Sequence, residues 1–453
     1  MKYNHLILLA GLLLFSCTGS NNEQQNEVRI RGYIESAENR EVNLSFDGAA
    51  SAIGNSRDIA LKVNNEGYFD TTFVLTEPAY YNLRRNTLYL TPGDNIEMNI
   101  SEDNTQSTFS GIGEEANMYM KDRLFLQAGS FIESGDNIRS NFDETKKTID
   151  SLATQRLLQL KNLSGVSDAF KKLEEARINA DKINSYLSFI PYANYLKQVG
   201  ETDIEIPEQA VFYNLLTSDV KPLLNEINDP EMLNVAAVRH VLSFKADSTL
   251  NELYFKDITL SERTKELLAI INEYPPSNEN ETPEEIEALA LFAKQLKNED
   301  FANELMYKIE QKSKLFSGKP AIDFEMEDRE GNKRMLSSFK GQALYLDIWA
   351  TWCAPCLKES PVFESLAKKY SGSNIAFLSI SIDNEKQLWS QFLNQHQKEL
   401  PQYFSKDNAL IEGWSITGIP RFILIDSDFN IAYASAARPS EKEIEVQINQ
   451  LLK

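Results

Sequence analysis

Two cysteines separated by two residues, Cys353 and Cys356, are the strongest chemical signal in this chain. They follow the apolar run 343–349, which predicts a buried strand, and precede a helical pattern over 357–370. The unpaired N–H groups and positive dipole end at the start of a helix favour a thiolate on the first sulfur. The second sulfur comes one turn later, close enough to form a disulfide. The spacing therefore predicts dithiol–disulfide chemistry, with Cys353 as nucleophile and Cys356 as the thiol that closes the disulfide.

Two other kinds of site also use a cysteine pair: a static disulfide and half of a zinc site. A zinc site needs further cysteine or histidine ligands. The chain has three cysteines and three histidines, and neither His240 nor His396 stands at a suitable spacing. We therefore favour a redox-active pair and expect no metal and no cofactor.

The third cysteine, Cys17, belongs to a different feature. Residues 1–16 combine Lys2, an apolar stretch and small residues, which is typical of a secretory signal peptide. Residues 14–17 resemble the bacterial lipobox, which implies cleavage before Cys17 and lipid attachment to its sulfur. The alternative is an ordinary cleaved signal with an incidental cysteine. The polar residues 17–27 would form a tether.

Composition limits the partners of this chain. The formal net charge of −21 argues against nucleic acid and against electrostatic adhesion to anionic lipid. No later stretch is long and apolar enough to be a transmembrane helix, so the lipid on Cys17 would provide the membrane anchor. A length of 453 residues with 42% hydrophobic content suggests about two to four domains with substantial cores.

The pattern of apolar residues changes twice along the chain. Over 28–110, short alternating runs between turn residues predict an antiparallel β-sandwich or barrel. Over 114–314 the period is helical, and we favour a packed bundle that spaces or shields the catalytic domain. The alternative is a docking surface for a partner or substrate. Expected strands are 28–34, 41–46, 67–75, 87–90 and 96–100; expected helices are 142–163, 166–190, 232–244 and 283–297, with 274–280 as an exposed connection.

Strands and helices alternate over 317–453, which predicts an α/β sheet with helices on both faces. The fold class is thus multidomain, with a β domain, an α-helical middle region and a C-terminal α/β domain. Expected strands of the last domain are 343–349, 375–382, 421–426 and 431–435, and expected helices are 357–370, 384–397 and 440–452.

Residues 346–356 resemble the core motif of thioredoxin-fold proteins, specifically the TlpA/ResA-like thiol-disulfide oxidoreductases. Residues 318–324 are similar to the entry segment of that family, and 328–332 to its hairpin turn. Residues 418–420 match its cis-proline loop. The resemblance covers 317–453, and the order of lipoprotein signal, β-rich domain, helical region and thioredoxin domain resembles cell-envelope proteins of Bacteroidetes-like bacteria.

The resemblance implies two candidate proton acceptors for Cys356, which must lose a proton when it attacks. Asp347 aligns with the buried acid of thioredoxins, and burial should raise its pKa. Glu359 aligns with a glutamate that ResA-like proteins use near their active site. We favour Asp347. The alternatives are a capped structural carboxylate at Asp347 and an ordinary solvated helix residue at Glu359.

A substrate-binding surface is also implied around the cysteines. Pro420 should adopt the cis form and present the backbone of Ile419 to an incoming disulfide peptide. We expect Trp352 to contact substrate and Trp349 to pack in the core. The residues between the cysteines, Ala354 and Pro355, complete this surface; Pro355 can begin the helix, and the dipeptide favours a reductase over an oxidase or isomerase.

The leading hypothesis is a cell-envelope reductase that acts on disulfide-containing exported proteins and is recharged by a membrane electron donor of thiol-reductase type. It would be lipid-anchored on the periplasmic side, with the outer membrane favoured over the inner. Cytochrome c maturation is one task of the family. One alternative is a thiol peroxidase of the peroxiredoxin branch, which residues 318–324 and 339–349 also resemble, although the Thr-x-x-Cys spacing is absent. The other is a lipid-anchored binding protein with a vestigial redox domain.

Overall fold

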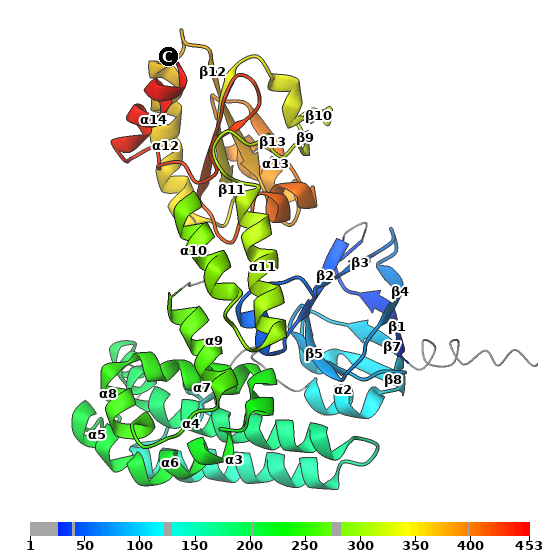
Figure 1. The fold of residues 1–453 in the computed structure, drawn as a ribbon, viewed down its shortest axis with the longest axis vertical. Coiled ribbons are helices and arrows are strands. Elements are labelled where there is room, and N and C mark those ends of the chain that lie inside the picture. The colour runs from blue at the N-terminus through cyan, green and yellow to red at the C-terminus, as the bar shows by residue number, and fades with distance from the viewer. Residues whose placement is uncertain (1–25, 39–40, 122–128, 201–202, 274–281, 397) are drawn as a thin grey trace, which may run out of the picture. The chain divides into compact units, whose positions relative to one another are not determined.

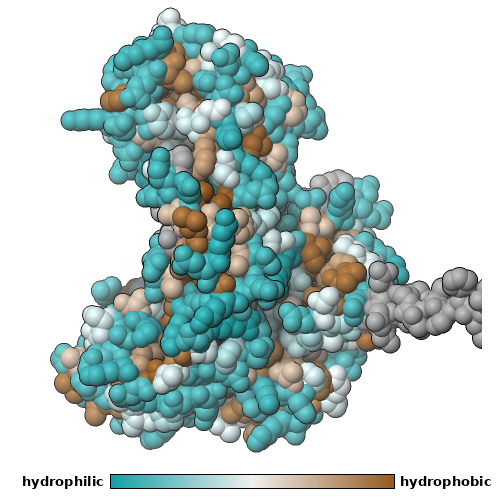
Figure 2. Space-filling view, viewed as in Figure 1, coloured by the Kyte–Doolittle hydropathy of each residue, from teal (hydrophilic) through white to brown (hydrophobic). Residues whose placement is uncertain are grey.

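The computed structural model describes residues 26–38, 41–121, 129–200, 203–273, 282–396 and 398–453. The chain divides into two compact units, Met1–Asn272 and Glu273–Lys453 (Figure 1). This division falls inside the helical region that we expected over 114–314. Among the described residues, no helix is both long and apolar enough to cross a membrane. Hydrophilic residues cover most of the face seen in Figure 2, in keeping with the high charge.

The first unit begins with two four-stranded sheets, in the orders β4-β1-β7-β8 and β3-β2-β5-β6. Residues from both sheets share one hydrophobic core, which makes the pair a sandwich. Burial alternates along β7, because every second side chain points into that core. The strands are β1 (Glu27–Ile34), β2 (Glu41–Phe46), β3 (Ile59–Lys62), β4 (Tyr68–Val74), β5 (Ala79–Leu83), β6 (Asn86–Leu90), β7 (Asn95–Ile100) and β8 (Thr108–Ile112).

Two features of this sandwich differ from the expectation. The pairing is not wholly antiparallel, because β1 and β7 run parallel while their other neighbours are antiparallel. The sequence analysis also missed β3, β5 and β8. The β5–β6 hairpin turns at Arg84 and Arg85 without glycine, and Arg84 itself takes a φ of 53°. The usual turn signal was therefore absent there.

Helices make up the rest of the first unit. The expected helix 166–190 extends further than predicted, because α4 continues through Pro191 and buries Ala193 and Leu196 in its last turns. The expected helix 232–244 is divided into a 3₁₀ turn (Pro230–Asn234) and α7. The helices are α2 (Glu114–Met120), α3 (Phe142–Asn162), α4 (Asp168–Gln198), α5 (Gln209–Leu215), α6 (Thr217–Glu226), α7 (Ala236–Ser243), α8 (Ser248–Leu250) and α9 (Glu262–Glu273).

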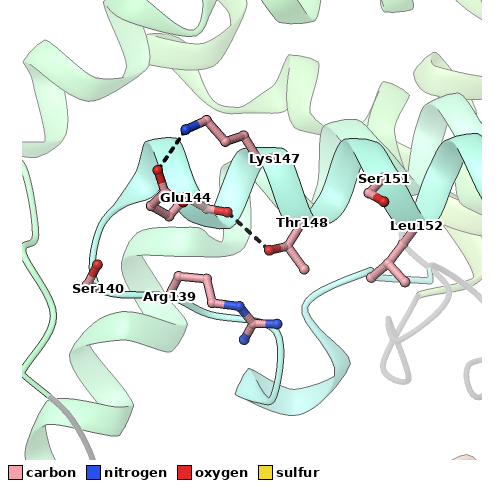
Figure 3. Close-up of a pocket in the computed structure, with 7 residues that line it drawn as sticks. All are labelled: Arg139, Ser140, Glu144, Lys147, Thr148, Ser151 and Leu152. Carbon is pink, nitrogen blue, oxygen red and sulfur yellow. Dashed lines mark hydrogen bonds and ion pairs between the residues drawn. The ribbon is translucent and has the colours of Figure 1, made fainter.

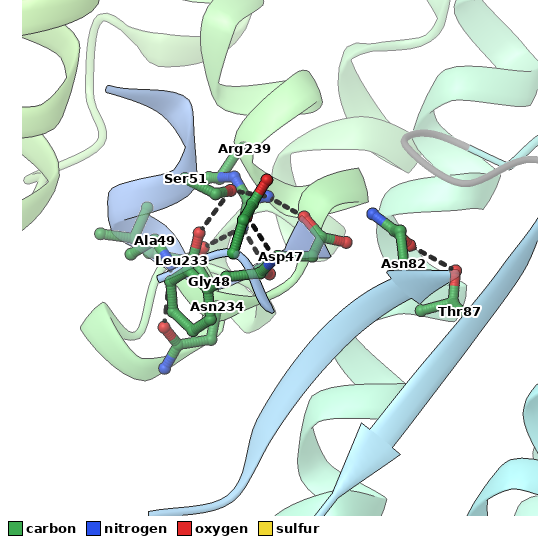
Figure 4. Close-up of polar contacts among 11 residues, drawn as sticks. Asp47, Gly48, Ala49, Ser51, Asn82, Thr87, Leu233, Asn234 and Arg239 are labelled. Carbon is green, nitrogen blue, oxygen red and sulfur yellow. Dashed lines mark hydrogen bonds and ion pairs between the residues drawn. The ribbon is translucent and has the colours of Figure 1, made fainter. Parts of the chain in front are cut away.

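A buried ion pair joins the sandwich to these helices (Figure 4). Arg239 on α7 donates to the carboxylate of Asp47, which follows β2, and to the carbonyl oxygen of Leu233 at 2.8 Å. The side chain of Asn234 accepts the N–H of Ala49 at 3.1 Å. The side chains of Arg239 and Asp47 are 11% and 7% exposed, so water screens this pair weakly.

The second unit contains two helices followed by a seven-stranded sheet in the order β10-β9-β13-β12-β11-β14-β15. The expected connection 274–280 lies outside the described residues. Thr282 caps α10 through a capping box with Glu285. The elements are α10 (Pro283–Ala293), α11 (Glu299–Ser313), β9 (Glu325–Glu327), β10 (Lys333–Met335), β11 (Ala343–Trp349), α12 (Ala354–Lys369), β12 (Ile375–Ser381), α13 (Lys386–Gln395), β13 (Gln402–Phe404), β14 (Arg421–Ile425), β15 (Ile431–Tyr433) and α14 (Glu443–Leu451).

The central strand β11 is buried along its whole length, parallel to β12 and antiparallel to β14. Ala343 and Tyr345 pack in one core with α12 and α14, which lie side by side in Figure 1. The even-numbered residues from Leu344 to Ile348 pack in a second core on the opposite face, with Leu410 and Trp414. Asp347 therefore lies on the face of the sheet that α12 covers.

Candidate active site

Cys353 and Cys356 form a disulfide at the start of α12, with their Cα atoms 5.3 Å apart. Cys353 is the N-cap residue, and its Sγ accepts the backbone N–H of Cys356 at 3.2 Å. Pro355 lies in the first turn, where a missing N–H costs nothing. The two cysteines are 3% and 1% exposed, so the pair is more buried than its position at a helix end suggested.

The surface around the disulfide is partly apolar. Trp352 is 66% exposed, and Ala354 and Pro355 are exposed beside it. Trp349, by contrast, is buried in one cluster with both cysteines, Trp389 and Phe404. The expected division between an outward-facing Trp352 and a core Trp349 agrees with this burial. Contact between Trp352 and a substrate stays a prediction.

The loop before β14 also reaches this cluster. The Ile419–Pro420 peptide bond is cis, as the resemblance implied. Ile419 is partly buried and packs against the cluster that holds Cys353 and Cys356. The structure thus brings this loop to the disulfide, although the two are more than 60 residues apart in the sequence.

Asp347 is 3% exposed and has one open hydrogen-bonding position. Ser379, its partner in the register of β11 and β12, donates from Oγ to Asp347 Oδ2 at 3.1 Å. Among the described residues, Asp347 Oδ1 has no hydrogen-bond partner. The pKa of Asp347 is raised to about 7, mainly by burial. The Ser379 hydrogen bond and the charge of Lys398 act against this rise, and the charge of Glu359 adds to it. A carboxyl with this pKa can exchange a proton near neutral pH.

Glu359 lies on α12, one turn after Cys356, and is only 8% exposed. It is therefore not the solvated helix residue that we kept as an alternative. Ser440 binds both of its oxygens: the backbone N–H reaches Oε2 at 3.1 Å, and the hydroxyl reaches Oε1 at 2.8 Å. The sequence analysis missed Ser440, because nothing local to residue 440 indicates a partner 81 positions away.

A second missed contact holds the turn before the cysteines. Asp383, which follows β12 and is 1% exposed, accepts the backbone N–H of Thr351 at 3.0 Å and its hydroxyl at 2.6 Å. Ser381 donates to the same carboxylate at 2.7 Å. The N–H of Cys353 bonds to the carbonyl oxygen of Ala350, so Thr351 lies inside the turn that carries the disulfide. Asp383 thus fixes that turn to the end of β12.

Lys398 is the third residue that the sequence analysis missed. Its Nζ donates to Ser360 Oγ at 2.5 Å and lies 3.9 Å from Glu364 Oε1, both on α12. The same atom is 6.0 Å from the ring centroid of Trp349. A largely buried positive charge therefore stands between α12 and the end of β11, on the side of the sheet where Asp347 lies.

A surface pocket of about 510 Å³ in the first unit is unrelated to these groups (Figure 3). Three of its polar residues already bind one another within α3: Lys147 pairs with Glu144 at 2.7 Å, and Thr148 Oγ1 donates to the carbonyl oxygen of Glu144 at 3.1 Å. Within the described parts of the chain, no three His, Cys, Asp or Glu side chains gather as a metal site would require.

Comparisons with known proteins agree on the C-terminal region. The Redoxin family model matches residues 316–449. The thiol-disulfide oxidoreductase ResA of Bacillus thuringiensis subsp. konkukian is 27% identical over 141 residues, which are 31% of this chain and 82% of that protein. ResA of Bacillus subtilis is 23% identical over 138 residues, 30% of this chain and 77% of its own. A crystal structure from Bacteroides vulgatus, of a candidate thiol-disulfide oxidoreductase, is 56% identical and covers 31% of this chain and 99% of its own, with a TM-score of 0.31.

Proposed function

We propose that this chain, a thiol-disulfide oxidoreductase with a C-terminal redoxin domain, reduces disulfides of exported proteins through Cys353 and Cys356. The observation that carries the proposal is the disulfide at the start of α12, beside the exposed Trp352 and the Ile419–Pro420 loop. A redox pair set next to an apolar surface suits the binding of an extended segment around a substrate disulfide.

The reaction starts from the dithiol form. The Cys353 thiolate attacks one sulfur of the substrate disulfide, forms a mixed disulfide and releases the other substrate sulfur as a thiolate, which takes a proton. Cys356 then loses its proton and attacks Cys353 Sγ. The Cys353–Cys356 bond forms, the mixed disulfide breaks, and the second substrate sulfur leaves. The substrate gains two electrons, the protein loses two, and a membrane dithiol donor of thiol-reductase type restores the dithiol form.

The location of this reaction is part of the proposal. Residues 1–16 would direct export, and lipid on Cys17 would hold the protein at the periplasmic side of a membrane, with the outer membrane favoured; all these residues lie outside the described part of the chain. Labelled fatty acid should enter the wild-type protein, and Cys17→Ala should abolish this incorporation. Label retained by the Cys17→Ala variant would contradict the anchor.

The central test is reduction of the interchain disulfides of insulin by the purified protein with a dithiol supply. We expect rapid reduction by the wild type and none by Cys353→Ser. The relatives named above carry the name thiol-disulfide oxidoreductase, which does not favour the thiol peroxidase alternative. Turnover of hydroperoxide faster than of insulin would favour that alternative instead. An unchanged phenotype of cells that carry Cys353→Ser would instead favour a lipid-anchored binding protein.

A further inference from the structure

We propose that the end of the sandwich at which β1 begins lies against a bilayer of zwitterionic lipid, with Val74 and Ile112 as its apolar contacts. The inference rests on the lipid anchor of the proposed function, because that anchor brings this end of the sandwich to a membrane. An anchor alone leaves the first unit free to turn, whereas this contact gives the sandwich one orientation toward the lipid.

The anchor and the sandwich are close in the sequence. Nine residues, 18–26, separate Cys17 from Glu27, the first residue of β1. A chain of that length reaches at most about 35 Å when fully extended, and a flexible chain spans about half of that on average. The opposite end of the same sheet is about 20 Å farther along the strands. The start of β1 is therefore the end of the sandwich that the anchor holds nearest to the membrane.

The two most exposed large apolar side chains of the described sandwich lie at this end. Val74 on β4 is 62% exposed, and Ile112 on β8 is 66% exposed. Val74 lies opposite Glu27 in the β1–β4 pair, and Ile112 lies opposite Asn95 in the β7–β8 pair. Asn95 in turn lies opposite Arg29 on β1. Both apolar side chains are therefore level with the first residues of β1.

Both side chains also point away from the core of the sandwich. Val28 and Ile96 are buried in that core, whereas their neighbours Glu27 and Asn95, which lie opposite Val74 and Ile112, are exposed. Strands β4, β1, β7 and β8 form one side of the sandwich (Figure 1), and β4 and β8 are the edge strands of this sheet. Three strand spacings, about 14 Å, therefore separate the two apolar residues. This spacing suits entry into a headgroup layer at two points rather than the binding of one small ligand.

The charges between the two apolar residues fit a zwitterionic headgroup layer. A pocket of about 610 Å³ on this face is lined by Ile112 and Arg29 and by the acidic residues Glu27, Asp70 and Asp94, among others. Arg29 Nε donates to the carboxylate of Asp70 at 2.9 Å. Three acidic residues against one arginine attract the ammonium group of a choline or ethanolamine headgroup and repel anionic lipid. The charge of this end therefore favours a neutral bilayer over an anionic one.

The test places a fluorescent label on full-length lipoprotein in phosphatidylcholine vesicles that carry a nitroxide quencher near the headgroups. Cys353 and Cys356 are joined in a disulfide and Cys17 would carry the lipid, so an introduced cysteine alone takes the label. We expect labels at Val74→Cys and Ile112→Cys to be quenched at least about twofold more strongly than a label at Tyr68→Cys. Replacement of part of the phosphatidylcholine by phosphatidylglycerol should weaken the quenching at the first two positions.

Tyr68 is the matched control for Val74. It is 53% exposed and lies on the same strand, but it pairs with Tyr33 at the opposite end of the sheet. Equal quenching at positions 68, 74 and 112 overturns the inference. Energy transfer between labels at position 112 of two copies, without quenching by lipid, would show that a second copy covers this face and would also overturn it.

A second measurement tests the apolar contacts themselves. A label at Asn95→Cys reports on the surface between them, and its quenching should fall to the level of position 68 in the double variant V74D/I112D. The single variant Tyr68→Asp should leave the quenching at position 95 unchanged. No effect of the double variant overturns the inference. If the wild-type protein does not associate with the vesicles at all, the lipid anchor of the proposed function is contradicted and the inference falls with it.

Discussion

Ser379 Oγ donates a 3.1 Å hydrogen bond to Asp347 Oδ2 across the β11–β12 pair, and among the described residues no other group bonds to the Asp347 carboxyl. A carboxyl that is 3% exposed with one donor is poorly compensated when charged. Its raised pKa, at about 7, expresses this cost. The residue that makes proton transfer feasible near neutral pH should therefore weaken the fold in the same pH range.

Replacement of Asp347 by Asn should stabilise the second unit at high pH. The pKa rises from 3.8 to about 7 on folding, so the cost is absent below pH 4, grows between pH 4 and 7 and is constant above. At about 1.4 kcal/mol per pKa unit, the gain at pH 8 should be a few kcal/mol at most. Denaturant unfolding followed by tryptophan fluorescence reports this unit alone, since all four tryptophans lie in it. The exposed Asp428→Asn is the control; equal effects at pH 4 and 8 would contradict the prediction.

Replacement of Cys356 by Ser should trap substrates on Cys353. Without the second sulfur, the mixed disulfide cannot be displaced from within the protein and persists. Non-reducing gels of envelope extracts, followed by mass spectrometry of the captured bands, identify the substrates, including any cytochromes c. Cys353→Ser is the matched control and should capture none. Capture by Cys356 in that control would reverse the assignment of the nucleophile.

Replacement of Thr351 by Val should loosen the turn that carries the disulfide. It removes a 2.6 Å hydrogen bond to the buried Asp383 carboxylate, and hydrogen bonds to charged groups contribute about 2 kcal/mol each. We expect a loss of that size in the free energy of unfolding, together with slower insulin reduction. Thr351→Ser keeps the hydroxyl and should lose under half as much. Equal stability of the two variants would show that this hydrogen bond contributes nothing measurable to the free energy of unfolding.

Replacement of Asp47 by Ala should destabilise the first unit. It leaves the guanidinium of Arg239 buried without its carboxylate, and such a loss costs about 3–5 kcal/mol. Hydrogen exchange measured by mass spectrometry should show faster exchange of α7 and β2. Asp257→Ala breaks an ion pair with Lys221 in which the aspartate is 72% exposed, and should change exchange little. Comparable effects from both variants would contradict the prediction that the buried pair stabilises the first unit more than the exposed pair does.

Much of the redox site could be predicted from the sequence because its signals are local. A buried strand shows as an apolar run, and a helix start shows as a cysteine cap followed by Pro355 in the first turn; β11 and α12 lie where these signals place them. The cysteine spacing then fixes which sulfurs can meet, because one helical turn separates them. The same is true of the N-cap at Thr282, where the capping box lies within four residues.

The tertiary structure alone decided the relationships between distant segments. Ser440 reaches Glu359 over 81 positions and Asp383 reaches Thr351 over 32, and neither contact leaves a periodic pattern in the sequence. The same limit applies to the parallel pairing of β1 with β7 and to the grouping of α10 and α11 with the C-terminal unit. Local periodicity records which face of an element is buried, but not which element covers it. The residues that contact the buried carboxyl groups therefore emerge only when the chain is folded.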